Sequence, residues 1–132
     1  MSIEIAERCR DLEQELREVA RVWVARLLLV RFLNRFGERM SKTERNRLSH
    51  EISILTRAGM YLANKLLERV YAECPEKRVW VEELLNQMGA QAIPLRKAPR
   101  TLRAAERIAR RVLGDADPLK ILARLEVRSA TL

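Results

Sequence analysis

The chain has 132 residues, of which 33% are charged and only 5% aromatic, with four glycines and four prolines. This composition predicts a single all-α domain that buries roughly two-thirds of the surface of its unfolded chain. The formal net charge is +8, and arginine outnumbers lysine by 21 to 5. This excess of arginine over lysine favours a phosphate-binding function, because arginine contacts phosphate well. A GC-rich genome or a hot habitat would produce the same excess without any such function. The longest apolar run is interrupted by arginines, which excludes a membrane-spanning helix.

The positive charge is concentrated toward the C-terminus. Residues 1–83 hold 16 basic and 14 acidic residues, whereas residues 84–132 hold 10 and 4. The C-terminal third is therefore the cationic part of the chain, and an anionic partner is expected to bind there.

The segment 3–37 is predicted to form one long helix. From Val19 to Phe36 this helix is apolar on two faces, and both faces must be covered by the chain itself or by another copy. We therefore expect a helical bundle that completes its core by oligomerisation, with the same or a related subunit forming a dimer. Apolar residues recur at helical spacing along one face of the segment: Ile5, Cys9, Leu12, Leu16, Val19 and Trp23.

Four further helices are predicted, over 42–73, 75–88, 100–113 and 118–125. Ser41 and Glu44 form a capping box for the second helix of the chain. Gly59 interrupts the apolar face of that helix and indicates either a kink or a close crossing with another helix. The crossing is favoured, because the apolar pattern resumes in register after it. Gly114 ends the fourth helix, Pro118 begins the fifth, and the residues after 127 are expected to fray.

The two cysteines, Cys9 and Cys74, are 65 residues apart and belong to no CxxC or Cys/His cluster, so no metal site is expected. Cys9 lies on the apolar face of the first helix. A buried, reduced thiol is the favoured state, and a disulfide is left open. We expect no signal peptide, because the opening residues Met1 to Glu4 contain an acid and lead into a charged helix.

Residues 96–111 contain seven basic groups and a single acid, Glu106. Five arginines fall within about 100° of one another on the helix, opposite an apolar face. Their repulsion costs stability unless an anion offsets it, as phosphates along a nucleic acid backbone would. An acidic protein partner or a solvated face are the alternatives, although a solvated face usually contains i,i+4 ion pairs. The nucleic-acid-binding residues predicted here are Arg96, Lys97, Arg100, Arg103, Arg107, Arg110 and Arg111.

A second stripe of arginines, about 80° wide, lies on the first helix. These residues complete the predicted nucleic-acid contact, although the last three could instead pair with acids of the second helix. Aromatic residues do not alternate with basic ones as they do in single-strand stacking platforms, so backbone contact is favoured over base reading. The stripe consists of Arg17, Arg21, Arg31, Arg35 and Arg39.

No catalytic motif is found. His50 is the only histidine, and its neighbours Ser49 and Glu51 point away from it on a helix, so the three form no relay. There is no Gly-rich phosphate loop, zinc-protease motif or nucleophile elbow. We expect a protein that is not an enzyme and has no cofactor and no small-molecule substrate.

A wholly helical chain of this length, with a long N-terminal helix and arginine stripes, resembles the major capsid proteins of filamentous viruses of hyperthermophilic archaea. The resemblance implies paired subunits that wrap and coat double-stranded DNA in a virion, without base specificity. Both arginine stripes would then face the DNA.

Two other functions are consistent with the same features. The chain is similar in size and charge to the small helical subunits of CRISPR effector complexes, which would make RNA the partner. A helical adaptor that binds an acidic protein is the third interpretation. Either alternative predicts a cytoplasmic location, and the sequence does not distinguish DNA from RNA.

Overall fold

The computed structural model describes the backbone of residues 3–94 and 97–131 and the side chains of residues 9–94 and 97–125. Within these ranges every regular element is a helix, which confirms the predicted all-α fold. Two long helices, α1 (Ile3–Phe36) and α2 (Lys42–Glu73), form an antiparallel hairpin through the 3-10 turn η1 (Gly37–Arg39). No helix in the described ranges is long and apolar enough to cross a membrane.

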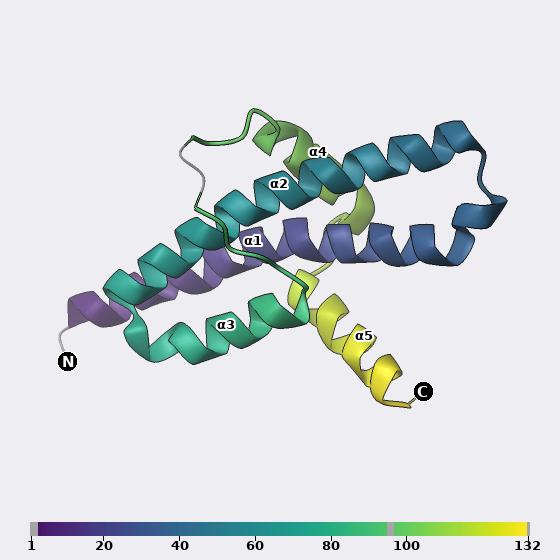
Figure 1. Ribbon diagram of the computed structural model, residues 1–132. Helices are drawn as coiled ribbons and strands as arrows, with labels where there is room; N and C mark the ends of the chain where they lie inside the picture. The colour runs from purple at the N-terminus through teal and green to yellow at the C-terminus, as the bar shows by residue number, and fades with distance from the viewer. Residues whose placement is uncertain (1–2, 95–96, 132) are drawn as a thin grey trace.

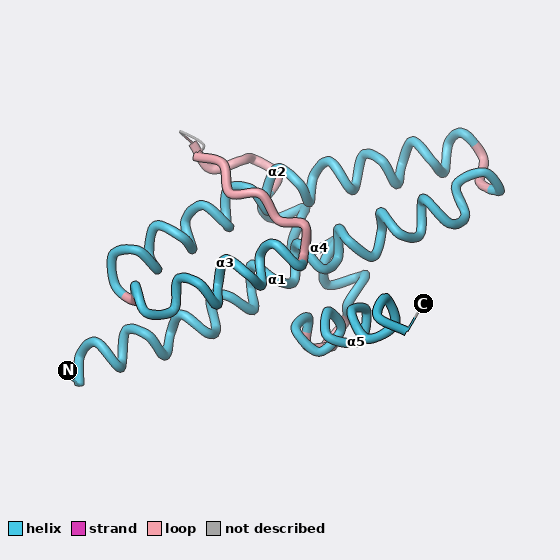
Figure 2. Tube along the Cα trace, turned by 60° about the horizontal axis from the view of Figure 1, so that its bottom comes forward, coloured by secondary structure: helices cyan, strands magenta, loops and turns pink. Residues whose placement is uncertain are grey.

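Three shorter helices pack on this hairpin. After the 3-10 turn η2 (Pro75–Lys77), α3 (Arg78–Gln87) lies beside the end of the hairpin that is far from η1 (Figure 1). Helix α4 (Leu102–Leu113) contacts both α1 and α2, and α5 (Pro118–Thr131) contacts α1. Figure 2 shows that the loop after α3 crosses the hairpin before α4 begins.

Local signals explain several helix ends. The Ser41 hydroxyl accepts a hydrogen bond from the Glu44 backbone N–H at 3.1 Å, so the predicted N-cap is present and α2 has the predicted bounds. Gly89 and Gly114 follow α3 and α4 with φ of 72° and 59°, a conformation that glycine adopts readily.

Other predicted bounds were wrong. The region 75–88 is divided into a 3-10 turn and a shorter α-helix, and α4 begins at Leu102 rather than at residue 100. Helix α5 continues to Thr131 instead of ending near residue 125, because no glycine or proline follows Pro118 to stop it.

The core fills the space between the hairpin and the three shorter helices. Apolar side chains of α1 and α2 interdigitate over the half of the hairpin nearest α3, and one face of α4 closes it from the side. The largest fully buried side chains are Leu12, Leu16, Trp23, Leu55, Leu66 and Met88. In the described part of the chain no charged or polar residue is fully buried.

The half of the hairpin nearest η1 is less covered. Buried residues of α1 end at Ala25, and every side chain from Arg26 to Phe36 is at least partly exposed. The two apolar faces predicted for the stretch from Val19 are therefore covered only over its first part. Phe32, in this half of α1, is 46% exposed.

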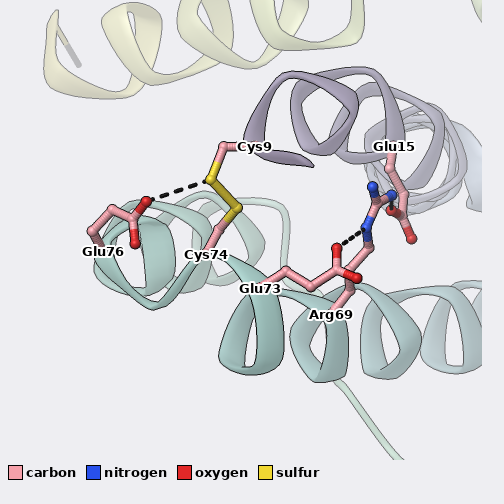
Figure 3. Close-up of polar contacts among 6 residues, drawn as sticks. All are labelled: Cys9, Glu15, Arg69, Glu73, Cys74 and Glu76. Atoms are coloured by element: carbon pink, nitrogen blue, oxygen red, sulfur yellow. Dashed lines mark hydrogen bonds and ion pairs between the residues drawn. A yellow bond between two sulfur atoms is a disulfide. The ribbon is translucent and has the colours of Figure 1, made fainter. Parts of the chain in front are cut away.

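The expectation of reduced thiols was wrong. Cys9 and Cys74 form a disulfide between the start of α1 and the end of α2, with Cα atoms 5.9 Å apart (Figure 3). Sequence separation concealed this pairing, because the antiparallel hairpin returns the chain to its starting point. The carboxylate of Glu76 lies 3.4 Å from Cys9 Sγ. A disulfide sulfur carries no proton, so this is a contact and not a donated hydrogen bond.

Candidate nucleic-acid interface

The orientation of α4 is fixed by its apolar side. Ala105, Ile108, Ala109 and Leu113 are buried against α1 and α2. The arginines occupy the opposite side of the helix, because three to four residues separate them from one another in the sequence. The packing of α4 therefore directs these arginines outward.

Three arginines on this side of α4, together with one in the turn before the helix, form what we call the α4 face: Arg103, Arg107 and Arg110, with Arg100. All four are exposed, and none forms an ion pair or hydrogen bond with another residue of the described chain. Arg103 and Arg110 are separated by about 10 Å along the helix axis. The α4 face is a row of exposed cations with no counterion among the described side chains.

The other members of the predicted cluster differ from these four. Arg111 forms an ion pair with Glu51 of α2, so its charge is already partly neutralised. Lys97 is exposed in the loop before α4. Arg96 lies outside the described residues.

Two acids limit one end of the α4 face. Arg110 lines a groove of about 270 Å³ together with Glu18, Arg21 and Glu106, although it pairs with neither acid. These carboxylates lower the local positive potential. We therefore expect Arg103 and Arg107 to contribute more to anion binding than Arg110 does.

The other end of α4 adds positive potential. Thr101 precedes the helix but makes no side-chain cap, and its hydroxyl oxygen is buried without a partner in the described chain. The first turn contains no acid to offset the partial positive charge of the helix N-terminus. Arg100 and Arg103 therefore lie beside a helix end that itself favours anions.

The arginine stripe on α1 is not a single surface. Arg17 forms an exposed ion pair with Glu13 at 3.8 Å, and the Arg21 guanidinium donates to the Gly114 carbonyl at 3.1 Å. Arg39 lies in η1, beyond the end of α1. These three therefore do not belong to one continuous nucleic-acid-binding face.

The remaining two residues of the stripe, Arg31 and Arg35, lie near the turn between α1 and α2. Both are exposed, and neither pairs with an acid of α2 in the described chain, contrary to the alternative predicted from the sequence. The Arg35 guanidinium lies over the Phe36 ring, 5.2 Å from its centroid.

A groove of about 450 Å³ lies between α1 and α2 and is lined mainly by charged residues. At its edge the Arg69 guanidinium pairs with Glu73 and with Glu15 across the hairpin (Figure 3). Hydrogen bonds to Glu73 and Glu15 raise the pKa of Arg69 above its ordinary value. Sequence analysis did not identify this cluster, because Glu15 and Arg69 are 54 residues apart. It ties the two helices together at the protein surface.

His50 is exposed on α2. Glu51 is turned toward Arg111 and not toward the imidazole. The geometry therefore gives His50 no orienting partner among these neighbours.

Comparison with known proteins supplies no relative from which a function can be transferred. No protein-family model matches the chain, and no curated protein and no solved structure matches it significantly.

Proposed function

We propose that the protein is a non-enzymatic nucleic-acid-coating protein that binds double-stranded DNA along its sugar–phosphate backbone through the α4 face. The observation that carries this proposal is the row of exposed arginines, without an acidic partner in the part of the chain that the structure describes, beside a helix whose other side is buried. Binding phosphates would release the counterions condensed on the DNA, which is the main driving force of sequence-independent association.

The side-chain chemistry favours backbone contact. Helix α4 contains no aromatic residue on which an unpaired base could stack. Its arginines are instead suited to bidentate contact with phosphate oxygens. The duplex is further favoured by the resemblance to capsid proteins that coat DNA, which would place this chain in a virion.

The test is a titration of labelled duplex DNA and labelled single-stranded RNA by fluorescence anisotropy at several salt concentrations. We expect tighter binding to the duplex, with affinity that falls as salt rises. The variant Arg103→Glu/Arg107→Glu should lose binding while its circular dichroism remains helical. The matched control is Arg57→Glu/Arg124→Glu, which makes the same change in net charge at exposed positions on α2 and α5.

The two double variants have the same net charge, so comparing them distinguishes binding at the α4 face from an effect of total charge. Equal losses would mean that total charge and not the α4 face determines binding. Tighter binding to RNA would favour a subunit of a guide-RNA complex, and no binding at low salt would favour an acidic protein partner.

A further inference from the structure

One surface near the hairpin turn combines an exposed and a half-buried aromatic ring with arginines that have no acidic partner in the described chain. We call Arg31, Phe32, Arg35 and Phe36 the tip face. The two phenyl rings lie with centroids 5.0 Å apart, and Phe32 is 46% exposed. An exposed aromatic cluster flanked by arginines has the composition of the centre of a protein–protein interface.

A second surface has similar apolar character and the opposite charge. We call Glu76, Val79, Trp80 and Glu83 the α3 face. Val79 is 64% exposed and Trp80 is 40% exposed. Glu83 has no cationic partner in the described chain, and Glu76 contacts only the sulfur of Cys9. Two cations adjoin this face: Lys77 lies over the Trp80 ring, 5.3 Å from its centroid, and Arg78 pairs with Glu82.

The two faces lie at opposite ends of the hairpin (Figure 1), so they cannot meet within one chain. Five large apolar residues are exposed among the described side chains, and these two faces contain three of them. A fourth, Tyr71, lies next to Arg78 and Glu82 of α3. Exposed apolar groups are therefore concentrated at the two ends, together with charges of opposite sign.

We infer that the tip face of one copy of this chain binds the α3 face of a second copy. Arg31 and Arg35 would meet Glu76 and Glu83, while Phe32 and Phe36 pack on Val79 and Trp80. Complementary charge of this kind fixes the pairing and excludes like ends from meeting. Because the two surfaces differ, the interface is heterologous. Two copies arranged antiparallel would form this contact twice, whereas copies arranged in series would form it repeatedly along a chain of molecules.

A second copy of the chain would cover both the tip face and the α3 face, which neither a nucleic acid nor an acidic membrane would do. A nucleic acid would neutralise the tip arginines but would be repelled by Glu76 and Glu83. An acidic membrane surface would also leave the α3 face uncovered. Only a partner that carries both surfaces covers both, and this chain is such a partner.

The test is sedimentation of the purified chain in the absence of nucleic acid, over a range of protein and salt concentrations. We expect association that weakens with salt, because exposed charges contribute to it. The variants Arg31→Glu/Arg35→Glu and Glu76→Arg/Glu83→Arg should each raise the dissociation constant at least about tenfold, since each places like charges together. Mixing the two variants should restore association, and so should combining all four substitutions in one chain.

The matched control is Arg57→Glu/Arg124→Glu, which should associate like the unchanged chain. A chain that stays monomeric at millimolar concentration would overturn the inference. It would also be overturned if the two reversed variants failed to associate when mixed, or if only the arginine reversal had an effect.

The outcome is independent of the proposed function, because the α4 arginines are unchanged and no nucleic acid is present. The variant Arg31→Glu/Arg35→Glu and the control Arg57→Glu/Arg124→Glu, which have the same net charge, are then titrated with duplex DNA at concentrations below self-association. Equal affinities would exclude the two tip arginines from the DNA contact that was predicted for the whole stripe on α1. Reduced DNA affinity without any self-association would assign the tip face to nucleic acid and refute the pairing of copies.

Discussion

The indole nitrogen of Trp23 donates a hydrogen bond to the backbone carbonyl of Gly59 at 2.9 Å, in the buried crossing of α1 and α2. A Cβ atom at residue 59 would lie only 2.6 Å from Trp23 Cε2. The close crossing predicted from the gap in the apolar face is therefore present. Residue 59 must be glycine here, because the Trp23 indole ring occupies the space that a Cβ atom would need.

Gly59→Ala should reduce the free energy of unfolding by about 1–3 kcal/mol, because the added methyl group overpacks a buried site. The same substitution at an unconstrained helix position would increase stability by about 1 kcal/mol. Urea unfolding, followed by circular dichroism, measures whether the free energy of unfolding falls or rises. In a Trp23→Phe background the penalty should shrink, since a phenyl ring lacks the atoms that clash. A Gly59→Ala variant more stable than the unchanged chain would contradict this account.

Reduction of the Cys9–Cys74 disulfide should lower the free energy of unfolding by about 2–4 kcal/mol, because the bond restricts the unfolded chain. The cysteines are 65 residues apart, which makes the closed loop long. Urea midpoints with and without a dithiol reductant measure the effect. The Cys9→Ala/Cys74→Ala variant is the control and should not respond to the reductant. An unchanged midpoint for the native sequence would show that the bond does not contribute.

Tyr71 should ionise above the ordinary tyrosine pKa of 10.0. Its hydroxyl donates to the Glu82 carboxylate, and this hydrogen bond is the main cause that raises the pKa of Tyr71; desolvation and the charge of Glu82 add to it. Because the pKa is higher in the folded state, the stabilisation is present below about pH 10 and is lost as pH rises through the folded pKa.

Absorbance of the tyrosinate ion, measured in a Tyr61→Phe background, reports the titration of Tyr71 alone. Glu82→Gln should return its midpoint toward 10.0. A midpoint that Glu82→Gln leaves unchanged would refute the assigned cause.

Two arginines of α4 should differ in their contribution to DNA binding. Arg107→Ala should reduce the slope of log affinity against log salt by about 0.9, the value for one lost phosphate contact on B-DNA. Arg111→Ala should change the slope less, because Glu51 already pairs with that guanidinium. Anisotropy titrations at several salt concentrations measure both slopes. Equal slopes for the two variants would mean that the ion pair opens when DNA binds.

Local features of this chain were predicted well from the sequence. The bounds of α2 follow from Ser41 and from the proline after Cys74, since both act through adjacent backbone groups. The two sides of α4 likewise follow from helical spacing alone.

Long-range pairings could not be predicted in the same way. The Cys9–Cys74 bond and the Arg111–Glu51 ion pair depend on how the helices are arranged in three dimensions. The arginine stripe on α1 was predicted to form one surface. In the structure Arg21 donates to the Gly114 carbonyl, whereas Arg31 makes no such contact and is exposed.

The position of the disulfide determines how a mechanical load would pass through the molecule. The bond closes most of α1, the turn and α2 into one covalent ring, and α3, α4 and α5 follow outside it. A force that pulls the two chain ends apart would pass directly from residue 9 to residue 74 through the sulfur atoms. The 64 residues between them would carry no tension while the bond is intact. Residues 31–36 lie inside this ring, whereas α4 and α5 lie outside it, so a pull on the two chain ends would load α4 and α5 and leave the tip face without tension.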